Sequence, residues 1–400
     1  MSAALDVREP DPSTTDRVDR LRRSLEGILG VPATEGNVVE TLRNGNEIFP
    51  AMLEAIDGAE HTIDFLTFVY WRGRIGTAFA EALSARARAG VRVRVLLDAW
   101  GSHPIDRGLI QMMEDAGVHV RWFRPLHRLA LTKANHRTHR KVMVVDEAIA
   151  FTGGVGIADE WDGDARNERE WRDTHFRLRG PAVDGLRAAF LDNWIETDPE
   201  IFDGTVDRFP EQPQAAGGAV IQCVRGASEV GASDLSTLVL SLLELAHERI
   251  RITTAFFVPD EELTQRLCAA SDRGVGVEIL LPGPHADKRF VQLAGRSVYG
   301  PLLAHGVRIW HFQPSMLHAK IMTVDGQVAN VGSANLNARS TALDEEINLV
   351  ALDRPLVRLL DEHFDEDLER SEEIDPGRWE DRSLGMRTLE GLTKPLRRSV

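Results

Sequence analysis

Two segments of the sequence repeat the same polar residues at one spacing: His-x-Lys, four residues, Asp, six residues, then Gly and a small residue. They are His139, Lys141, Asp146, Gly153 and Gly154 in the first copy, and His318, Lys320, Asp325, Gly332 and Ser333 in the second. A neutral imidazole is a nucleophile near pH 7, and a second, protonated imidazole can donate to a leaving alkoxide. Lysines supply positive charge to phosphate oxygens in the transition state. The repeated set therefore suits phosphoryl transfer.

The four residues between Lys and Asp, VMVV and IMTV, are mostly apolar and predict a strand in each copy. Alternation along a strand places the histidine and lysine of each copy on one face. The small residues that follow let backbone approach a phosphate. We assign phosphate binding to Lys141, Lys320, Gly154, Ser333 and Asn335. Two half-sites that face each other would place one histidine on each side of a phosphorus atom.

A histidine in this chemistry needs an acceptor on its other ring nitrogen. Each half offers a carboxylate at the start of a later strand: Asp173, 34 residues after the first histidine, and Glu346, 28 residues after the second. We assign both as orienting residues of their halves. Asp344 and Glu345 are alternatives to Glu346, with Glu345 the least favoured because strand alternation turns it away if residue 346 faces inward.

The repeat extends well beyond these motifs. ARAGVRVRVLLDAWG (87–101) matches SDRGVGVEILLPG (271–283), and DAGVHVRWFRP (115–125) matches AHGVRIWHFQP (304–314). Three matched segments in one order, at nearly constant offset, indicate a duplication. Strands that alternate with helices predict α/β units, with each sheet sandwiched between helices.

These patterns predict five regions along the chain. They are a flexible leader with a short helix (1–36), a first unit (37–203), a linker rich in Pro, Gly and Gln (204–217), a second unit (218–370) and a polar, basic tail (371–400). We expect the two units to pack together and share one active site at their interface.

Composition limits the partners. Lys plus Arg total 47 against 62 for Asp plus Glu, so the net charge of −15 disfavours broad binding to nucleic acid. No apolar run approaches the ~20 residues of a membrane span, so we expect any membrane contact to be peripheral. Cys223 and Cys268 have no metal-ligand spacing and suit a reducing compartment. His136 and His139 lack a third ligand nearby, which argues against a metal site.

Two further segments have two interpretations each. Val18, Leu21, Leu25 and Leu29 form one stripe of a helix that either packs on the body or lies on a membrane. The connection 126–138, with apolar Leu126, Leu129 and Leu131, either packs over the second unit or touches lipid at the mouth of the site. The end of the tail, 388–400, is basic and apolar and is expected to be solvated or loosely docked.

The duplicated motif resembles the phospholipase D superfamily over residues 45–370. Within it, FFVPDEEL (256–263), MLHAKIMTVDG (316–326), VGSANLNARSTALDEEINLV (331–350) and WRDTHFRLRGPAV (171–183) are similar to the bacterial cardiolipin synthase branch. The resemblance implies two duplicated α/β/α sandwich units of phospholipase D type. It also implies that neither a metal nor a cofactor is needed.

By this resemblance His139 is the nucleophile that forms a phosphohistidine. His318 protonates the leaving group and later activates the acceptor hydroxyl. The motif also includes Asp146 and Asp325 in the catalytic set, although holding neighbouring backbone suits them better. The first copy departs from the pattern at Gly156, where family members often carry Asn, and this weakens its expected phosphate donors.

The resemblance favours cardiolipin synthesis from two phosphatidylglycerol molecules, with release of glycerol, at the inner face of the cell membrane. A phospholipase D-type hydrolase, in which water replaces the acceptor, is the alternative because both reactions use one intermediate. A nuclease of the same superfamily is disfavoured by the net charge. A silent binding module is disfavoured by the intact motifs in both halves.

Overall fold

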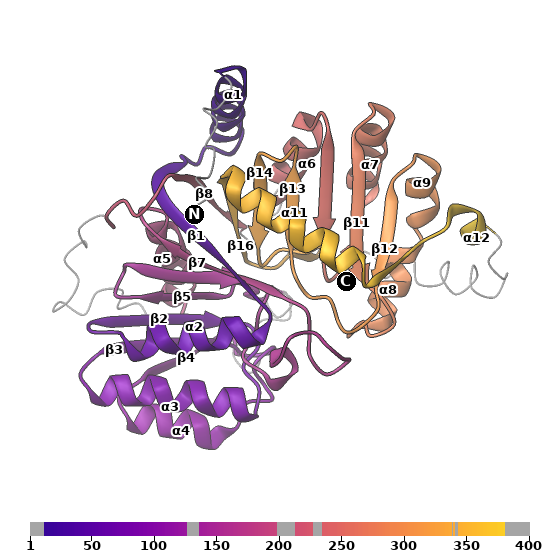
Figure 1. The fold of residues 1–400 in the computed structure, drawn as a ribbon. Helices are drawn as coiled ribbons and strands as arrows, with labels where there is room; N and C mark the ends of the chain where they lie inside the picture. The colour runs from indigo at the N-terminus through magenta and orange to yellow at the C-terminus, as the bar shows by residue number, and fades with distance from the viewer. Residues whose placement is uncertain are drawn as a thin grey trace, which may run out of the picture.

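The computed structural model describes residues 12–125, 136–197, 213–226, 234–337, 339–340 and 343–380. Within these residues, fifteen strands form one continuous sheet that has two halves of matching strand order. In Figure 1 the strands of the first half run across the view and those of the second half run up it. The duplication predicted from the sequence is thus confirmed.

The strands of the first half, from the joint outward, are β1 (Thr34–Arg43), β7 (Thr174–Arg179), β6 (Ile149–Gly153), β5 (Val142–Val145), β2 (Thr62–Thr67), β3 (Arg92–Asp98) and β4 (His119–Phe123). Those of the second half are β8 (Ala219–Gly226), β16 (Glu346–Leu352), β14 (Val328–Gly332), β13 (Ile321–Val324), β9 (Arg249–Thr253), β11 (Gly276–Pro282), β12 (Arg308–Phe312) and, at its edge, β17 (Ser371–Glu373). β1 and β8 pair antiparallel and join the halves. In each half only the three strands β2, β3 and β4, or β9, β11 and β12, run parallel.

Helices cover both faces of the sheet. In the first half they are α2 (Gly45–Asp57), α3 (Arg74–Arg88), α4 (Arg107–Asp115), a short turn η2 (Asp159–Trp161) and α5 (Val183–Ile195). In the second half they are α6 (Asp234–Leu245), α7 (Glu261–Asp272), α8 (Arg289–Arg296), α9 (Tyr299–Ala304), α11 (Arg354–Leu368) and α12 (Pro376–Glu380). β10 (Phe257–Val258) and β15 (Leu336–Asn337) form a separate two-stranded sheet.

The local sequence explains these elements. β3 reads RVRVLLD, and its apolar residues are buried on both faces because helices lie on both sides. Asp106, Asp260 and Asp353 cap α4, α7 and α11 by accepting hydrogen bonds from backbone N–H groups of the first turn.

One apolar cluster belongs to both halves. Phe190 of α5 and Leu360 of α11 lie in the same buried cluster as Phe176 of β7 and Leu349 of β16. The halves therefore share part of their core, which fixes their relative position.

The N-terminal helix α1 (Pro12–Leu29) packs on the second half. Leu25 and Leu29 are buried in the same cluster as Leu238 and Leu242 of α6. This agrees with the interpretation of a helix packed on the body rather than on a membrane. The sheet already begins at Thr34, within the region expected to be a flexible leader.

Other predictions fall outside the described residues. These are the loop residues Leu126, Leu129 and Leu131, most of the linker 204–217 and the tail end 388–400. Among the helices that the structure describes, none is long and apolar enough to cross a membrane.

Candidate active site

Both motif histidines line one cavity of about 610 Å³ that is built from both halves. His139 and Lys141 come from the first half, and His318 comes from the second. Much of the remaining wall is aromatic, and its rings belong to Phe68, Trp71, Trp100, Trp161, Trp171 and Phe256. The shared site that the duplication predicts is thus present as one open pocket lined by both halves.

Backbone hydrogen bonds between the halves hold each histidine. The N–H of His139 donates to the carbonyl of Glu345 over 2.8 Å, and the N–H of Glu345 donates to the carbonyl of Arg137 over 2.9 Å. In the same way, the N–H of His318 donates to the carbonyl of Arg172 over 2.7 Å. Each histidine is therefore bridged to the residue that precedes the carboxylate of the other half.

The side chains follow the same crossed arrangement. Nδ1 of His139 lies 2.9 Å from Oε1 of Glu346, and Nδ1 of His318 lies 2.8 Å from Oδ2 of Asp173. The assignment of each carboxylate to its own half is wrong, although both carboxylates do contact a motif histidine. The reason is that β7 and β16 begin at the interface, where Asp173, just before β7, and Glu346, the first residue of β16, face the opposite half.

The two alternatives to Glu346 have other partners. Asp344 pairs with Arg339 over 2.9 Å, and burial raises its pKa to about 7. The side chain of Glu345 points to the opposite side of the extended chain from Glu346, and it pairs with Arg124 over 2.8 Å. Glu346 itself is fully buried against the histidine. The geometry therefore selects Glu346, as strand alternation indicated.

Ser333 and Gly154 contact the carboxylates rather than an open phosphate position. The hydroxyl of Ser333 donates to Oε2 of Glu346 over 2.5 Å. A Cβ on Gly154 would lie 2.3 Å from Oδ1 of Asp173, so only glycine leaves room for that carboxylate. In the first half the indole N–H of Trp161 takes the place of the serine hydroxyl and donates to Asp173 over 2.8 Å. The assignment of Ser333 and Gly154 to phosphate binding is therefore replaced by support of the two carboxylates.

The departure at Gly156 has a packing cause. A Cβ there would lie 2.6 Å from Cβ of Val69 and 3.3 Å from the ring of Trp161. The corresponding Asn335 of the second half is buried, and its Oδ1 has no hydrogen-bond partner among the described residues. Asn335 is not among the residues that line the cavity, and its assignment to phosphate binding stays a prediction.

Both motif lysines stay beside their own histidines. Nζ of Lys141 donates to the carbonyl of His139 over 2.7 Å and lies 5.6 Å from the ring centre of Phe68. Nζ of Lys320 lies 3.0 Å and 3.2 Å from the two ring nitrogens of His318. Burial lowers the pKa of Lys141 to about 8 and that of Lys320 to about 7. An incoming anion would therefore stabilise the charged form of both lysines.

Burial also keeps the imidazoles neutral. It lowers the pKa of His139 to about 4 and, with help from Lys320, that of His318 to about 3. Burial alone would raise the pKa of Asp173, but its pairing with His318 prevails and lowers it to about 2. Each histidine therefore presents a neutral ring whose Nδ1 is held by an ionised carboxylate.

Asp146 and Asp325 lie away from the cavity. Asp146 accepts from the backbone N–H groups of residues 60–62, and Asp325 accepts from those of residues 247–249. Both have a positive φ, 50° and 52°, in the turn that follows their strand. They fasten β2 and β9 at their starts, which is the backbone-holding role, and neither is placed for catalysis.

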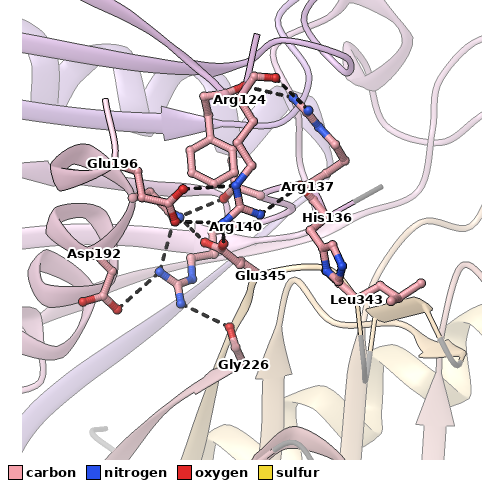
Figure 2. A network of polar contacts seen from close by, with 12 residues as sticks. Arg124, His136, Arg137, Arg140, Asp192, Glu196, Gly226, Leu343 and Glu345 are labelled. Atoms are coloured by element: carbon pink, nitrogen blue, oxygen red, sulfur yellow. Dashed lines mark hydrogen bonds and ion pairs between the residues drawn. The ribbon is translucent and has the colours of Figure 1, made fainter. Parts of the chain in front are cut away.

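An arginine-rich network surrounds Arg137 and Glu345, whose backbone hydrogen bonds hold His139 (Figure 2). Arg124 donates to both Glu345 and Glu196. Arg140 is buried and donates to the carbonyls of Ala189 and Gly226, one from each half. This network fixes the segment that carries His139, just before β5.

Asp98, at the end of β3, connects that strand with the cavity wall. Its buried carboxylate accepts from the guanidinium of Arg137 over 3.0 Å and from the backbone N–H groups of Trp100 and Gly101. The Asp98 carboxylate thus holds both the cavity-wall residues 100–101 and Arg137, which lies two residues before His139.

Among the described residues, no three His, Cys, Asp or Glu side chains are arranged to hold an ion. His136, considered because of its spacing, contacts the carbonyl of Leu343 over 3.2 Å.

The sequence did not reveal several members of the site. Trp161, Asp98 and the aromatic wall carry no motif spacing of their own. A tryptophan soon after the glycine pair and a carboxylate at the end of a buried strand were the available signals, and neither distinguishes a site residue from a core residue.

The fold and the site together define a duplicated α/β enzyme of the phosphodiester-transfer class. A family model described as "Cardiolipin synthase, PLD-like domain" matches residues 52–161 and 239–368. The chain belongs to this phospholipase D-like family, as the motifs indicated.

Curated relatives support this family assignment, and a solved structure supports the fold. The chain is 33% identical over 387 residues to cardiolipin synthase 1 of Bacillus cereus, covering 95% of this chain and 76% of that protein. It is 35% identical over 364 residues to cardiolipin synthase 2 of Bacillus anthracis, covering 89% and 69%. Phosphatidylserine synthase of Haemophilus influenzae has the same fold, with a TM-score of 0.71, 15% identity and coverage of 96% and 97%.

Proposed function

We propose that this protein is a phospholipase D-type phosphatidyltransferase that makes cardiolipin from two phosphatidylglycerol molecules and releases glycerol. The observation that carries the proposal is the pair of neutral imidazoles that line one cavity, each with Nδ1 on a buried carboxylate. The names of the relatives supply the lipid reaction.

In the first step, Nε2 of His139 attacks the phosphorus of the donor lipid. The N–P bond forms as the P–O bond to the head-group glycerol breaks, so the phosphatidyl group stays on His139. His318 gives its proton to the leaving glycerol oxygen. Lys141 and Lys320 stabilise the non-bridging oxygens. Because the free site holds His318 neutral, His318 must take up a proton from solvent as the substrate binds, and the negative charge of the phosphodiester favours this by raising the pKa of His318.

In the second step, the terminal hydroxyl of the acceptor gives its proton to His318, and its oxygen attacks the phosphorus. The N–P bond breaks and His139 is restored. Water in place of the acceptor would give phosphatidate, which is the hydrolase alternative. The synthase names of the matched relatives favour transfer over hydrolysis.

We further propose that the protein acts peripherally on a membrane, at its cytoplasmic face. Trp100 lines the cavity and is nevertheless 64% exposed, and Phe290 at the start of α8 is 51% exposed. Large exposed aromatic side chains suit the boundary between lipid and water. Co-sedimentation with phosphatidylglycerol vesicles tests this, with a clear loss expected for Trp100→Ser combined with Phe290→Ser. Unchanged binding contradicts it.

The function is tested by incubating the protein with phosphatidylglycerol vesicles and resolving the lipids and free glycerol. Cardiolipin with an equal amount of glycerol supports the proposal, whereas phosphatidate supports hydrolysis. Neither product, together with cleavage of DNA, overturns the lipid assignment. His139→Ala should form no covalent phospho-intermediate. Trapped phosphate in that variant would assign the nucleophile elsewhere.

A further inference from the structure

A third lysine lies at the cavity and has no role in the two motifs. Lys288 immediately precedes α8, lines the cavity and is exposed. Its Nζ lies 5.6 Å from the ring centre of Phe256, and that ring lies 6.4 Å from the ring of His318. The two distances together place the ammonium within about 12 Å of the His318 ring.

The charge of Lys288 is available to a ligand. No carboxylate of the described residues lies within ion-pair distance of it, and its ammonium lies over the face of Phe256. The adjacent Asp287 also lines the cavity, but its carboxylate forms no ion pair with Lys288. Among the described residues of the cavity wall, Lys288 and Lys141 are the lysines, and the wall contains no arginine.

The proposed reaction creates a demand for such a cation. In the second step one phosphoryl group is already bonded to His139 and held by Lys141 and Lys320. The acceptor lipid carries a phosphodiester of its own, one glycerol unit away from the hydroxyl that attacks. The bound phosphoryl group and the acceptor phosphodiester are both negative and would repel each other at this separation. A separate positive charge at the acceptor phosphodiester would offset the repulsion.

We propose that Lys288 binds the phosphodiester of the acceptor lipid and thereby selects a phosphate-bearing alcohol over water and small alcohols. This inference rests on the proposed function. Lys288 holds the acceptor while its hydroxyl proton passes to His318, the new P–O bond forms and the N–P bond to His139 breaks. The ring of Phe256 contacts the ammonium on one side and His318 on the other, and so connects the proposed acceptor site with the proton-transfer residue.

Partition of the common intermediate tests the assignment. The protein is incubated with phosphatidylglycerol vesicles in the presence of ethanol, and three products are measured: cardiolipin, phosphatidylethanol and phosphatidate. All three arise from the same phosphohistidine, so their ratio is independent of donor binding. In Lys288→Met the ratio of cardiolipin to the other two should fall about tenfold, while glycerol is still released.

Two matched variants separate this from general effects. Arg289→Met removes the neighbouring positive charge, which is outside the cavity wall, and should leave the ratio unchanged. Lys288→Arg keeps the positive charge and should therefore retain most of the wild-type product ratio. An unchanged ratio in Lys288→Met, or an equal fall in Arg289→Met, overturns the assignment. Thermal unfolding checks that Lys288→Met is folded, and Lys288→Gln replaces it if it is not.

The outcome also separates the two proposals. If the wild-type protein releases no glycerol, the proposed function fails and the role of Lys288 fails with it. If it releases glycerol and forms cardiolipin with a ratio that does not depend on residue 288, only the role of Lys288 fails.

Discussion

Nδ1 of His139 lies 2.9 Å from Oε1 of Glu346, which is 207 residues further along the chain and in the other half of the sheet. His318 and Asp173 repeat this relationship in the opposite direction over 145 residues. Each half therefore holds a histidine whose orienting carboxylate belongs to its neighbour. A substitution in one half should consequently be felt in the chemistry of the other.

The crossed pairs predict separable effects of two carboxamide variants. Glu346→Gln should slow formation of the phosphohistidine by about 10²–10⁴-fold, because His139 loses the carboxylate that holds its ring. Asp173→Asn acts on His318 and should impair proton transfer instead. A donor lipid with a p-nitrophenolate leaving group needs little protonation, so its burst of p-nitrophenolate should survive in Asp173→Asn and be lost in Glu346→Gln. The reverse result would mean that each carboxylate serves its own half.

The buried lysines predict an alkaline loss of activity. A lysine is charged only below its pKa, so Lys320 loses its charge in the free enzyme as the pH rises through about 7, and Lys141 does so near 8. On the acid side, His139 remains a neutral nucleophile down to about pH 4. Because the reacting enzyme must also take up the proton that His318 donates, kcat/KM should already decline between about pH 4 and 7 and should fall more steeply above 7. A limb that rises through pH 6.5 would show that the histidines titrate without the effect of burial.

The motif aspartates should affect stability rather than chemistry. Asp146→Ala removes three accepted backbone hydrogen bonds and places alanine at positive φ, so the free energy of unfolding should fall by about 3 kcal/mol. Asp146→Asn keeps one acceptor and tolerates that φ, so it should cost less. Denaturant unfolding measures both. Turnover per folded molecule should stay near wild type, and its loss without a change in stability would return Asp146 to the active site.

The packing around Gly156 predicts a compensated pair of substitutions. Gly156→Asn alone brings a Cβ to 2.6 Å from Cβ of Val69 and should destabilise the protein by about 1–3 kcal/mol. Adding Val69→Ala removes Cγ1, which would lie 3.0 Å from the new Cβ, but keeps the Cβ of residue 69, so it should recover only part of the loss. Thermal unfolding of the two single variants and the double variant gives the coupling free energy. Strict additivity would show that Val69 is not the obstacle.

Much of this architecture could be predicted from local pattern. The apolar runs that follow His139 and His318 are strands, the repeated order of segments gives two matching half-sheets, and Glu346 is selected over Glu345 by alternation along β16. The strands and the choice of Glu346 depend on contacts within a few residues, where the backbone period fixes the answer, and the two half-sheets follow from the matched segments.

The pairing between halves could not be predicted in the same way. Counting from His139 to Asp173 locates a carboxylate at the start of a strand, but it carries no information on which half that residue faces. That depends on the bridges formed by Arg172 and Glu345 across the interface. The serine and the glycine after the motif strands misled for a related reason, since a small residue makes room equally for a substrate phosphate and for a neighbouring carboxylate.

The different supports of the two carboxylates, a hydroxyl from Ser333 and an indole from Trp161, have a consequence for ancestry and divergence. Reciprocal contacts of this kind are what two identical subunits related by a twofold axis would make. In a dimer every mutation appears on both sides at once, so attacking and proton-donating centres must remain alike. Joining the copies in a single polypeptide removes that restriction, and each side can then be adjusted separately for its own step.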